Sequence, residues 1–230
     1  MESVNEFGQP VGVSLGGWRP PLHPSAERLS GRTVQLVAFD ADAHGADLFG
    51  SFGAATDDLW TYMPWGPFVS SGDLGETFAA AAAQPDWLTY SLIVDGRALG
   101  VSSYLRIDPD GGVIEIGGIT YGPALQRTVA STETSYVLIR HAFELGYRRV
   151  EWKCDNLNAP SRAAARRLGF TFEGVFRKAA HYKHRSRDTA WFAIIDDDWP
   201  RIDAEFKRWL GPSNFDQSGE QRTPLRTQAL

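Results

Sequence analysis

The feature that most constrains the fold is a change in how the strands are connected along the chain. Three strand-like segments, at 88–94, 98–107 and 113–116, follow one another across tight Asp-Gly turns, which predicts antiparallel neighbours. Further along, a strand at 149–154 lies between two helical segments, at 131–145 and 158–169. A strand, helix, strand order predicts a parallel crossover. We therefore expect one α/β (α+β) domain with a mixed, mostly antiparallel sheet.

The ends of the chain differ in composition from its middle. Residues 1–30 are rich in Gly and Pro, which predicts an extended N-terminal arm or tail. Residues 31–210 hold the alternating strands and helices of the domain, including a first strand near 33–37 and helices near 42–55 and 71–84. Residues 211–230 are polar and predict a flexible C-terminal tail.

Composition excludes several classes of function. The formal net charge of -5 is not that of a nucleic-acid binder, which usually carries a basic surplus. The single cysteine, Cys154, allows no intramolecular disulfide and is typical of a reducing compartment. The first residues show no secretory leader, no window reaches the ~20 apolar residues of a membrane helix, and no His lies at metal-ligand spacing. We expect a cytoplasmic protein without metal.

A candidate anion site lies in residues 126–133, where a strand passes into a helix. The helix opens with Ser131, Thr132 and Glu133. The N-terminus of a helix presents several free backbone N–H groups, and its macrodipole adds positive potential. The segment could bind a pyrophosphate or simply be a capped strand-to-helix connection.

This segment resembles the acyl-CoA loop of GNAT acetyltransferases, Gln/Arg-x-x-Gly-x-Gly/Ala, with Gln126 in the first position. The resemblance implies helices on both faces of a sheet splayed at a β-bulge. Val129 replaces the usual middle glycine, so the loop must follow a more ordinary backbone path. The resemblance implies acetyl-CoA as co-substrate, bound by Gln126, Arg127, Thr128, Val129, Ala130, Ser131 and Thr132.

A second segment narrows the resemblance. Asp155 to Arg162, then Leu168-Gly169-Phe170 and Glu173-Gly174, follow the order and spacing of the RimJ/RimL branch. Those enzymes acetylate the N-termini of proteins, notably ribosomal ones, and have relatives that act on other amines. Asn158 and Leu168-Gly169 also have ordinary roles as helix cap and helix end.

The resemblance also assigns catalytic roles. Glu173 matches the base of RimL-type enzymes, and Glu115 matches a strand position that often binds water or the incoming amine. The family often uses a tyrosine as the acid, but that position is Ala165 here, so Ser161 is the candidate. Asn158 is expected to contact the pantetheine, and a backbone N–H near Ile119, beside a bulge at 117–118, to polarise the acetyl oxygen.

The acceptor side is marked by aromatic residues between the two early helices. Trp60, Tyr62 and Trp65 could form a rigid pocket wall or pack in the core. The expected partner is an amine, either a protein N-terminal α-amine or a small molecule such as an antibiotic, bound by a monomer or homodimer. The alternative to an N-acetyltransferase is a non-catalytic module that binds or senses acyl-CoA.

Overall fold

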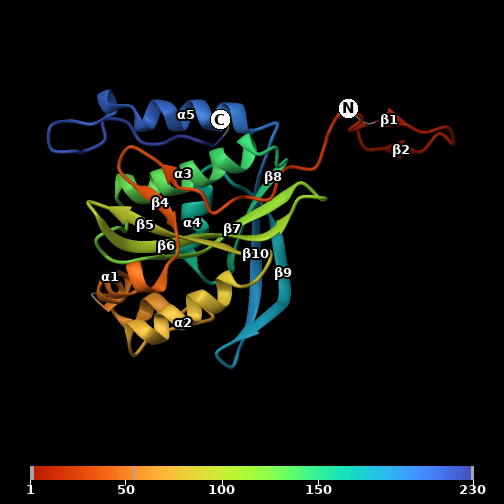
Figure 1. Cartoon of the computed structure of the whole chain (residues 1–230). Coiled ribbons are helices and arrows are strands. Elements are labelled where there is room, and N and C mark those ends of the chain that lie inside the picture. Colours follow the sequence, from red (N-terminus) through yellow and green to blue (C-terminus); the bar gives the residue numbers. More distant parts are fainter. Residues whose placement is uncertain (1–2, 54, 229–230) are drawn as a thin grey trace.

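The computed structural model describes residues 3–53 and 55–228, and its centre is one eight-stranded sheet (Figure 1). The strands lie in the order β3-β4-β5-β6-β7-β8-β10-β9, and β7–β8 is the parallel pair among antiparallel neighbours. This confirms the mixed sheet. The strands of the sheet are β3 (Leu29–Ser30), β4 (Gln35–Ala38), β5 (Leu88–Val94), β6 (Arg97–Asp108), β7 (Val113–Tyr121), β8 (Arg149–Asp155), β9 (Thr171–Tyr182) and β10 (Arg185–Ile195).

Local sequence signals explain several element boundaries. The β5–β6 turn places Asp95 and Gly96 at positive φ, as a tight hairpin requires. The α-helices are α1 (Ala41–Gly53), α2 (Ser71–Ala82), α3 (Val129–Glu144), α4 (Ala159–Arg167) and α5 (Trp199–Leu210), and the short helical turns are η1 (Asp57–Trp60) and η2 (Pro212–Asn214). Helix α3 begins at Val129 rather than Ser131, because Thr128 caps it by accepting a bond from the Ser131 N–H.

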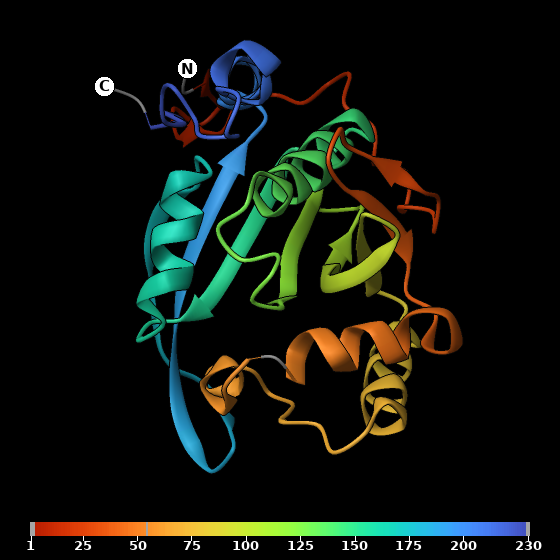
Figure 2. The ribbon, with the colours of Figure 1, turned by 90° about the vertical axis from the view of Figure 1, so that its left-hand side faces the viewer.

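The helices cover both faces of the sheet (Figure 2). Helices α1 and α2 enclose a smaller core that includes Leu48, Phe52 and Phe78. Helices α3, α4 and α5 pack on the opposite face over a larger core that includes Leu138, Phe170 and Phe206. No helix in the described part of the chain has the length and apolar character needed to traverse a membrane.

The sheet divides between β7 and β8. These strands pair only from Val113↔Arg149 to Glu115↔Glu151, after which β7 continues with β6 and β8 with β10. The β6–β7 register shifts beside Gly118, whose φ of 60° lies in the left-handed region that glycine adopts freely. The expected bulge is therefore present, and it opens a gap between the two halves of the sheet.

The two ends of the chain differ in how they pack against the domain. Strands β1 (Ser3–Val4) and β2 (Pro10–Val11) form a separate exposed hairpin that extends away from the domain (Figure 1). At the other end, where the sequence predicts a flexible tail, residues 211–228 pack against the domain and bury Leu225 and Thr227. Residues 229–230, also part of that prediction, lie outside the described residues.

Candidate functional site

A cavity of about 1550 Å³ lies where β7 and β8 part. Its walls come from the α1–α2 connection, the facing strands β7 and β8, the first turn of α3 and the helix α4. The splay of the sheet thus joins elements from both of its faces around one space. Of the residues predicted for the site, those that line the cavity are Tyr62, Trp65, Glu115, Ile119, Gln126, Arg127, Ser131, Thr132, Asn158 and Ser161.

The start of α3 forms one end of the cavity. Thr128 caps the helix by accepting a bond from the Ser131 N–H, and the first-turn residues that line the cavity are Ser131 and Thr132. The positive φ of this loop falls on Arg127, at 60°, and not on Val129. Val129 packs against the large core, so valine at the position of the family's middle glycine leaves the cavity open. Thr128, Val129 and Ala130 are not among the lining residues.

The start of α4 forms the adjoining wall. The Asn158 side chain accepts a hydrogen bond from the Ser161 N–H at 3.1 Å, which caps the helix as the sequence predicts. The Ser161 hydroxyl accepts a bond from the Trp152 indole Nε1 at 3.0 Å. This bond fixes the hydroxyl oxygen and leaves its proton available to another acceptor. Ala165, the position of the family's tyrosine, is fully buried.

Glu115 is a buried carboxylate in the wall of the cavity. Its side chain is 6% exposed and is contacted by the Lys153 Nζ at 3.1 Å and the Arg106 Nη1 at 3.3 Å. Burial raises the pKa of Glu115 above its ordinary value, and the attraction of Lys153 and Arg106 opposes that rise. A carboxyl with a raised pKa is a stronger base than an exposed one.

Glu115 belongs to a row of alternating charges that crosses the sheet. Lys153, which is 4% exposed, also contacts the Glu151 Oε2 at 2.6 Å, and its ammonium lies 3.8 Å from the centre of the Trp191 ring. Glu151 in turn contacts the Arg149 Nε at 2.8 Å. The row continues from Arg149 to Glu173 on β9, at the edge of the sheet.

The structure places Glu173 away from the cavity. Its carboxylate accepts two bonds from the Arg149 guanidinium, at 2.8 and 2.5 Å, and its side chain is 40% exposed. These bonds hold the pKa of Glu173 below its ordinary value. Glu173 is not among the lining residues, so the geometry does not bring it to the reacting centre.

The aromatic segment before α2 divides between the cavity and the core. Tyr62 and Trp65 line the cavity, and the Tyr62 hydroxyl donates to the Leu157 carbonyl oxygen at 3.1 Å. Trp60 is 4% exposed and packs edge-on against Phe52 in the small core. Of the three aromatic residues predicted for the acceptor wall, Trp60 thus has a core position.

Lys153, Arg106 and Trp191 are site residues that sequence reasoning missed. One signal was available, because Arg149, Glu151 and Lys153 alternate along β8 and must share a face of the sheet. Alternating charges inside a strand between two helices indicate a buried polar face, but their partners on β6, β7 and β10 follow only from the tertiary fold.

Comparison with known proteins gives a consistent result. The family model for the acetyltransferase (GNAT) domain matches residues 34–171. A solved GCN5-related N-acetyltransferase from Brucella melitensis is 38% identical, with a TM-score of 0.87 over 92% of this chain and 97% of that one. A probable GNAT-family acetyltransferase from Chromobacterium violaceum is 41% identical, with a TM-score of 0.80 over 84% of this chain and 98% of that one.

A more distant structural relative comes from the predicted branch. It is an acetyltransferase from Salmonella typhimurium, described as modifying the N-terminal serine of the 50S ribosomal subunit protein L7/L12. It is 22% identical, with a TM-score of 0.65 over 74% of this chain and 99% of that one. At this identity the likeness shows a shared fold.

Proposed function

The chain belongs to the GNAT acetyltransferase family, and from this premise we propose that it transfers an acetyl group from acetyl-CoA to a primary amine. The family makes the chain an acyltransferase. The observation that carries the proposal is the continuity of one cavity from the first turn of α3 to the buried Glu115. One end of this cavity offers the Arg127 cation and the hydroxyls of Ser131 and Thr132 to an anion, and the other offers a base to an amine.

The residues at the start of α3 fit the diphosphate of acetyl-CoA. The lining side chains there are an amide, a cation and two hydroxyls, from Gln126, Arg127, Ser131 and Thr132. The first turn of α3 has no acidic residue, and Glu133, which follows it, is directed elsewhere, because its carboxylate accepts bonds from backbone N–H groups of residues 32 and 33 at 2.7 and 2.6 Å. No carboxylate of the first turn therefore repels an anion at this end.

The proposed reaction is a direct attack in a ternary complex. Glu115 accepts a proton from the acceptor ammonium, and the freed nitrogen lone pair attacks the thioester carbonyl. A nitrogen–carbon bond forms and the carbon–sulfur bond breaks, while a backbone N–H near Ile119 stabilises the charge on the carbonyl oxygen. Ser161, whose oxygen is held by Trp152, gives its proton to the leaving sulfur, and its hydroxyl is restored by the second proton that the attacking nitrogen loses as the amide forms.

We propose the α-amine of a peptide as the first class of acceptor. An α-amine has a pKa of about 7.7–8.0 against about 10.4 for lysine, so it loses a proton to a carboxylate more readily. The raised pKa of Glu115 also brings the pKa of the base closer to that of the amine, which makes the proton transfer easier. Tyr62 and Trp65 supply a rigid aromatic wall for the residue that carries the amine. A small-molecule amine is the other acceptor class to test.

The test is release of free thiol from acetyl-CoA in the presence of a panel of peptides and small amines. Replacing Glu115 by Gln should lower kcat by about 10²–10⁴-fold, the usual contribution of a general base. Glu173→Gln is the matched control, because it removes another strand carboxylate that accepts bonds from an arginine. It should leave kcat within a few-fold of the original.

Two results would contradict the proposal. Silence across the whole panel, together with calorimetric binding of CoA, would select the non-catalytic binding module instead. Equal losses of kcat in Glu115→Gln and Glu173→Gln would show that Glu115 is not distinguished from Glu173 as the base. Thermal unfolding of each variant separates loss of activity from loss of fold.

A further inference from the structure

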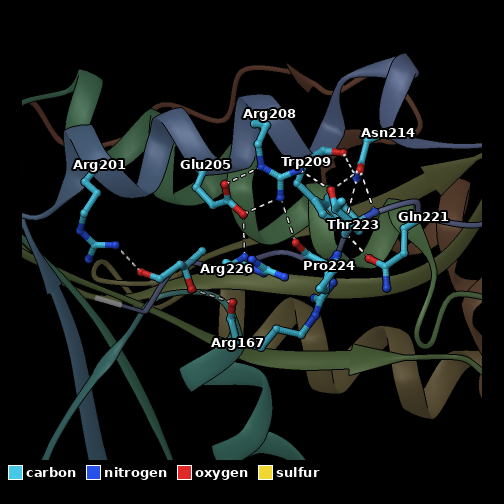
Figure 3. A network of polar contacts seen from close by, with 11 residues as sticks. Arg167, Arg201, Glu205, Arg208, Trp209, Asn214, Gln221, Thr223, Pro224 and Arg226 are labelled. Atoms are coloured by element: carbon cyan, nitrogen blue, oxygen red, sulfur yellow. Dashed lines mark hydrogen bonds and ion pairs between the residues drawn. The ribbon is translucent and has the colours of Figure 1, made fainter. Parts of the chain in front are cut away.

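The segment 211–228, which we call the C-terminal strap, is ordered by contacts along α5. The Arg208 guanidinium donates to the Thr223 hydroxyl at 2.6 Å and to the Pro224 carbonyl oxygen at 2.9 Å. The Arg226 N–H donates to the Glu205 carboxylate at 2.6 Å (Figure 3). These bonds carry the strap back along α5 toward the C-terminal end of α4.

The end of the strap is hydrogen-bonded to Arg167, the last residue of α4. The Thr227 hydroxyl, whose residue is 1% exposed, donates to the Arg167 carbonyl oxygen at 2.8 Å. The Thr227 carbonyl oxygen accepts from the Arg201 Nη1 at 2.5 Å. Packing is close, because a Cβ on Gly169 would lie 3.1 Å from the Thr227 Cβ. The strap thereby fixes the backbone from which the Arg167 side chain extends.

The strap also supports the side chain of Arg167, through Trp209 on α5. The guanidinium of Arg167 lies 5.3 Å from the centre of the Trp209 ring, and the Trp209 indole donates to the Gln221 side-chain oxygen at 2.7 Å (Figure 3). Arg167 is therefore held at two points: Thr227 bonds its carbonyl oxygen, and Gln221 holds the Trp209 ring that its guanidinium contacts.

Arg167 reaches the anion-binding end of the cavity. Its Nη1 donates to the Thr132 hydroxyl in the first turn of α3 at 3.0 Å, and Arg167, Thr132 and Gln221 all line the cavity. Within the described residues, no carboxylate lies within ion-pair distance of its guanidinium. An exposed cation without a counter-ion, fixed beside a helix N-terminus, is suited to an anionic ligand.

We propose that the C-terminal strap is part of the co-substrate site, and that it positions Arg167 to bind the phosphate groups of acetyl-CoA. This inference rests on the proposed function, because it assigns the nucleotide-bearing end of acetyl-CoA to the start of α3. Arg167 is the binding residue, and Thr227 and Gln221 are positioning residues that act through it.

The test compares acetyl-CoA with acetyl-pantetheine, a thioester that lacks the diphosphate and the nucleotide. Arg167→Met should raise KM for acetyl-CoA about 10- to 100-fold, the loss expected for a charge-assisted hydrogen bond. It should leave kcat/KM for acetyl-pantetheine unchanged. Arg166→Met is the matched control, because the neighbouring arginine does not line the cavity and should change neither value.

A double-mutant cycle tests the role of the strap. Thr227→Val removes one neutral hydrogen bond, so KM for acetyl-CoA should rise about 2- to 10-fold in the original chain. In the Arg167→Met background the same change should have no further effect, because the residue it positions is gone. Gln221→Leu should behave in the same way, so the test does not depend on a single variant.

Several results would overturn the inference. Arg167 would not be a phosphate-binding residue if Arg167→Met changed the kinetics with both thioesters equally, or with neither. The strap would have a purely structural role if the effects of Thr227→Val and Arg167→Met on KM were additive. Failure of the unaltered protein to bind CoA in calorimetry would instead contradict the proposed function. The two failures are therefore distinguishable.

Discussion

The sharpest prediction concerns Lys153, the buried cation between Glu115 and Glu151. Its ammonium lies 3.1 and 2.6 Å from the two carboxylates, and the three side chains are 4%, 6% and 9% exposed. Lys153→Met keeps much of the side-chain shape and removes the charge. The two buried carboxylates then lose the cation between them, and each keeps one arginine, Arg106 for Glu115 and Arg149 for Glu151. Breaking a buried ion pair from one side costs about 3–5 kcal/mol.

The assay is urea unfolding at neutral pH. With a slope near 3 kcal/mol per M, at the upper end for small proteins, a loss of about 3–5 kcal/mol moves the midpoint down by about 1–2 M. Lys207→Met is the matched control, because Lys207 contacts Asp203 at the same 2.6 Å but its side chain is 64% exposed. Its midpoint should stay within the error of the measurement, since water screens exposed pairs.

A second change tests the cause. Adding Glu151→Gln to Lys153→Met removes one of the two neighbouring negative charges, so part of the lost stability should return. The reasoning is refuted if Lys153→Met costs less than about 1 kcal/mol. It is also refuted if the double variant is no more stable than the single one, because the loss would then come from packing and not from charge.

Three further predictions concern the cavity and the β-bulge beside it. Because Lys153 lowers the pKa of Glu115 against the effect of burial, the acidic limb of the kcat/KM profile should move to higher pH in Lys153→Met, and an unmoved limb would exclude Glu115 as the base. Gly118→Ala places a side chain at a φ of 60° and should cost about 1–2 kcal/mol, or about 2–8 °C in Tm, whereas Gly72→Ala inside α2 should be neutral or stabilising. Tyr62→Phe removes the hydrogen bond from this cavity-lining residue to the Leu157 carbonyl oxygen and should raise KM for the acceptor about 2- to 10-fold without changing KM for acetyl-CoA. Equal changes in both KM values would show that the substitution disturbs the whole cavity.

Parts of the site that rest on local signals could be read from the sequence. The start of α3 is predicted only to within two residues, because Thr128 and not a later residue is the cap. Asn158 caps α4 three residues before its partner, so residue type and spacing are sufficient to place that cap. The Asp95-Gly96 hairpin and the glycine-containing bulge at 117–118 follow for the same reason. These features define the sheet, its splay and the start of each helix beside the cavity.

The remainder depends on contacts between distant segments. Glu115 and Lys153 lie on strands that become neighbours only through the α3 crossover, so their pairing has no local signal. The strap has few apolar residues, and its composition therefore resembles a disordered tail. It is ordered instead by hydrogen bonds from charged side chains of α5, such as Arg208 and Glu205, that fall outside the strap itself.

The order of the elements along the chain has a consequence for biosynthesis. Thr227 follows Arg167 by 60 residues, so at about 5–20 residues per second the ribosome adds it about 3–12 s later. The last two strands of the sheet, β9 and β10, are made within that interval, and Arg167 still lacks the support of Thr227 when they are complete. On the proposed role of the strap, a nascent chain would thus acquire full affinity for acetyl-CoA only after Thr227 has been added.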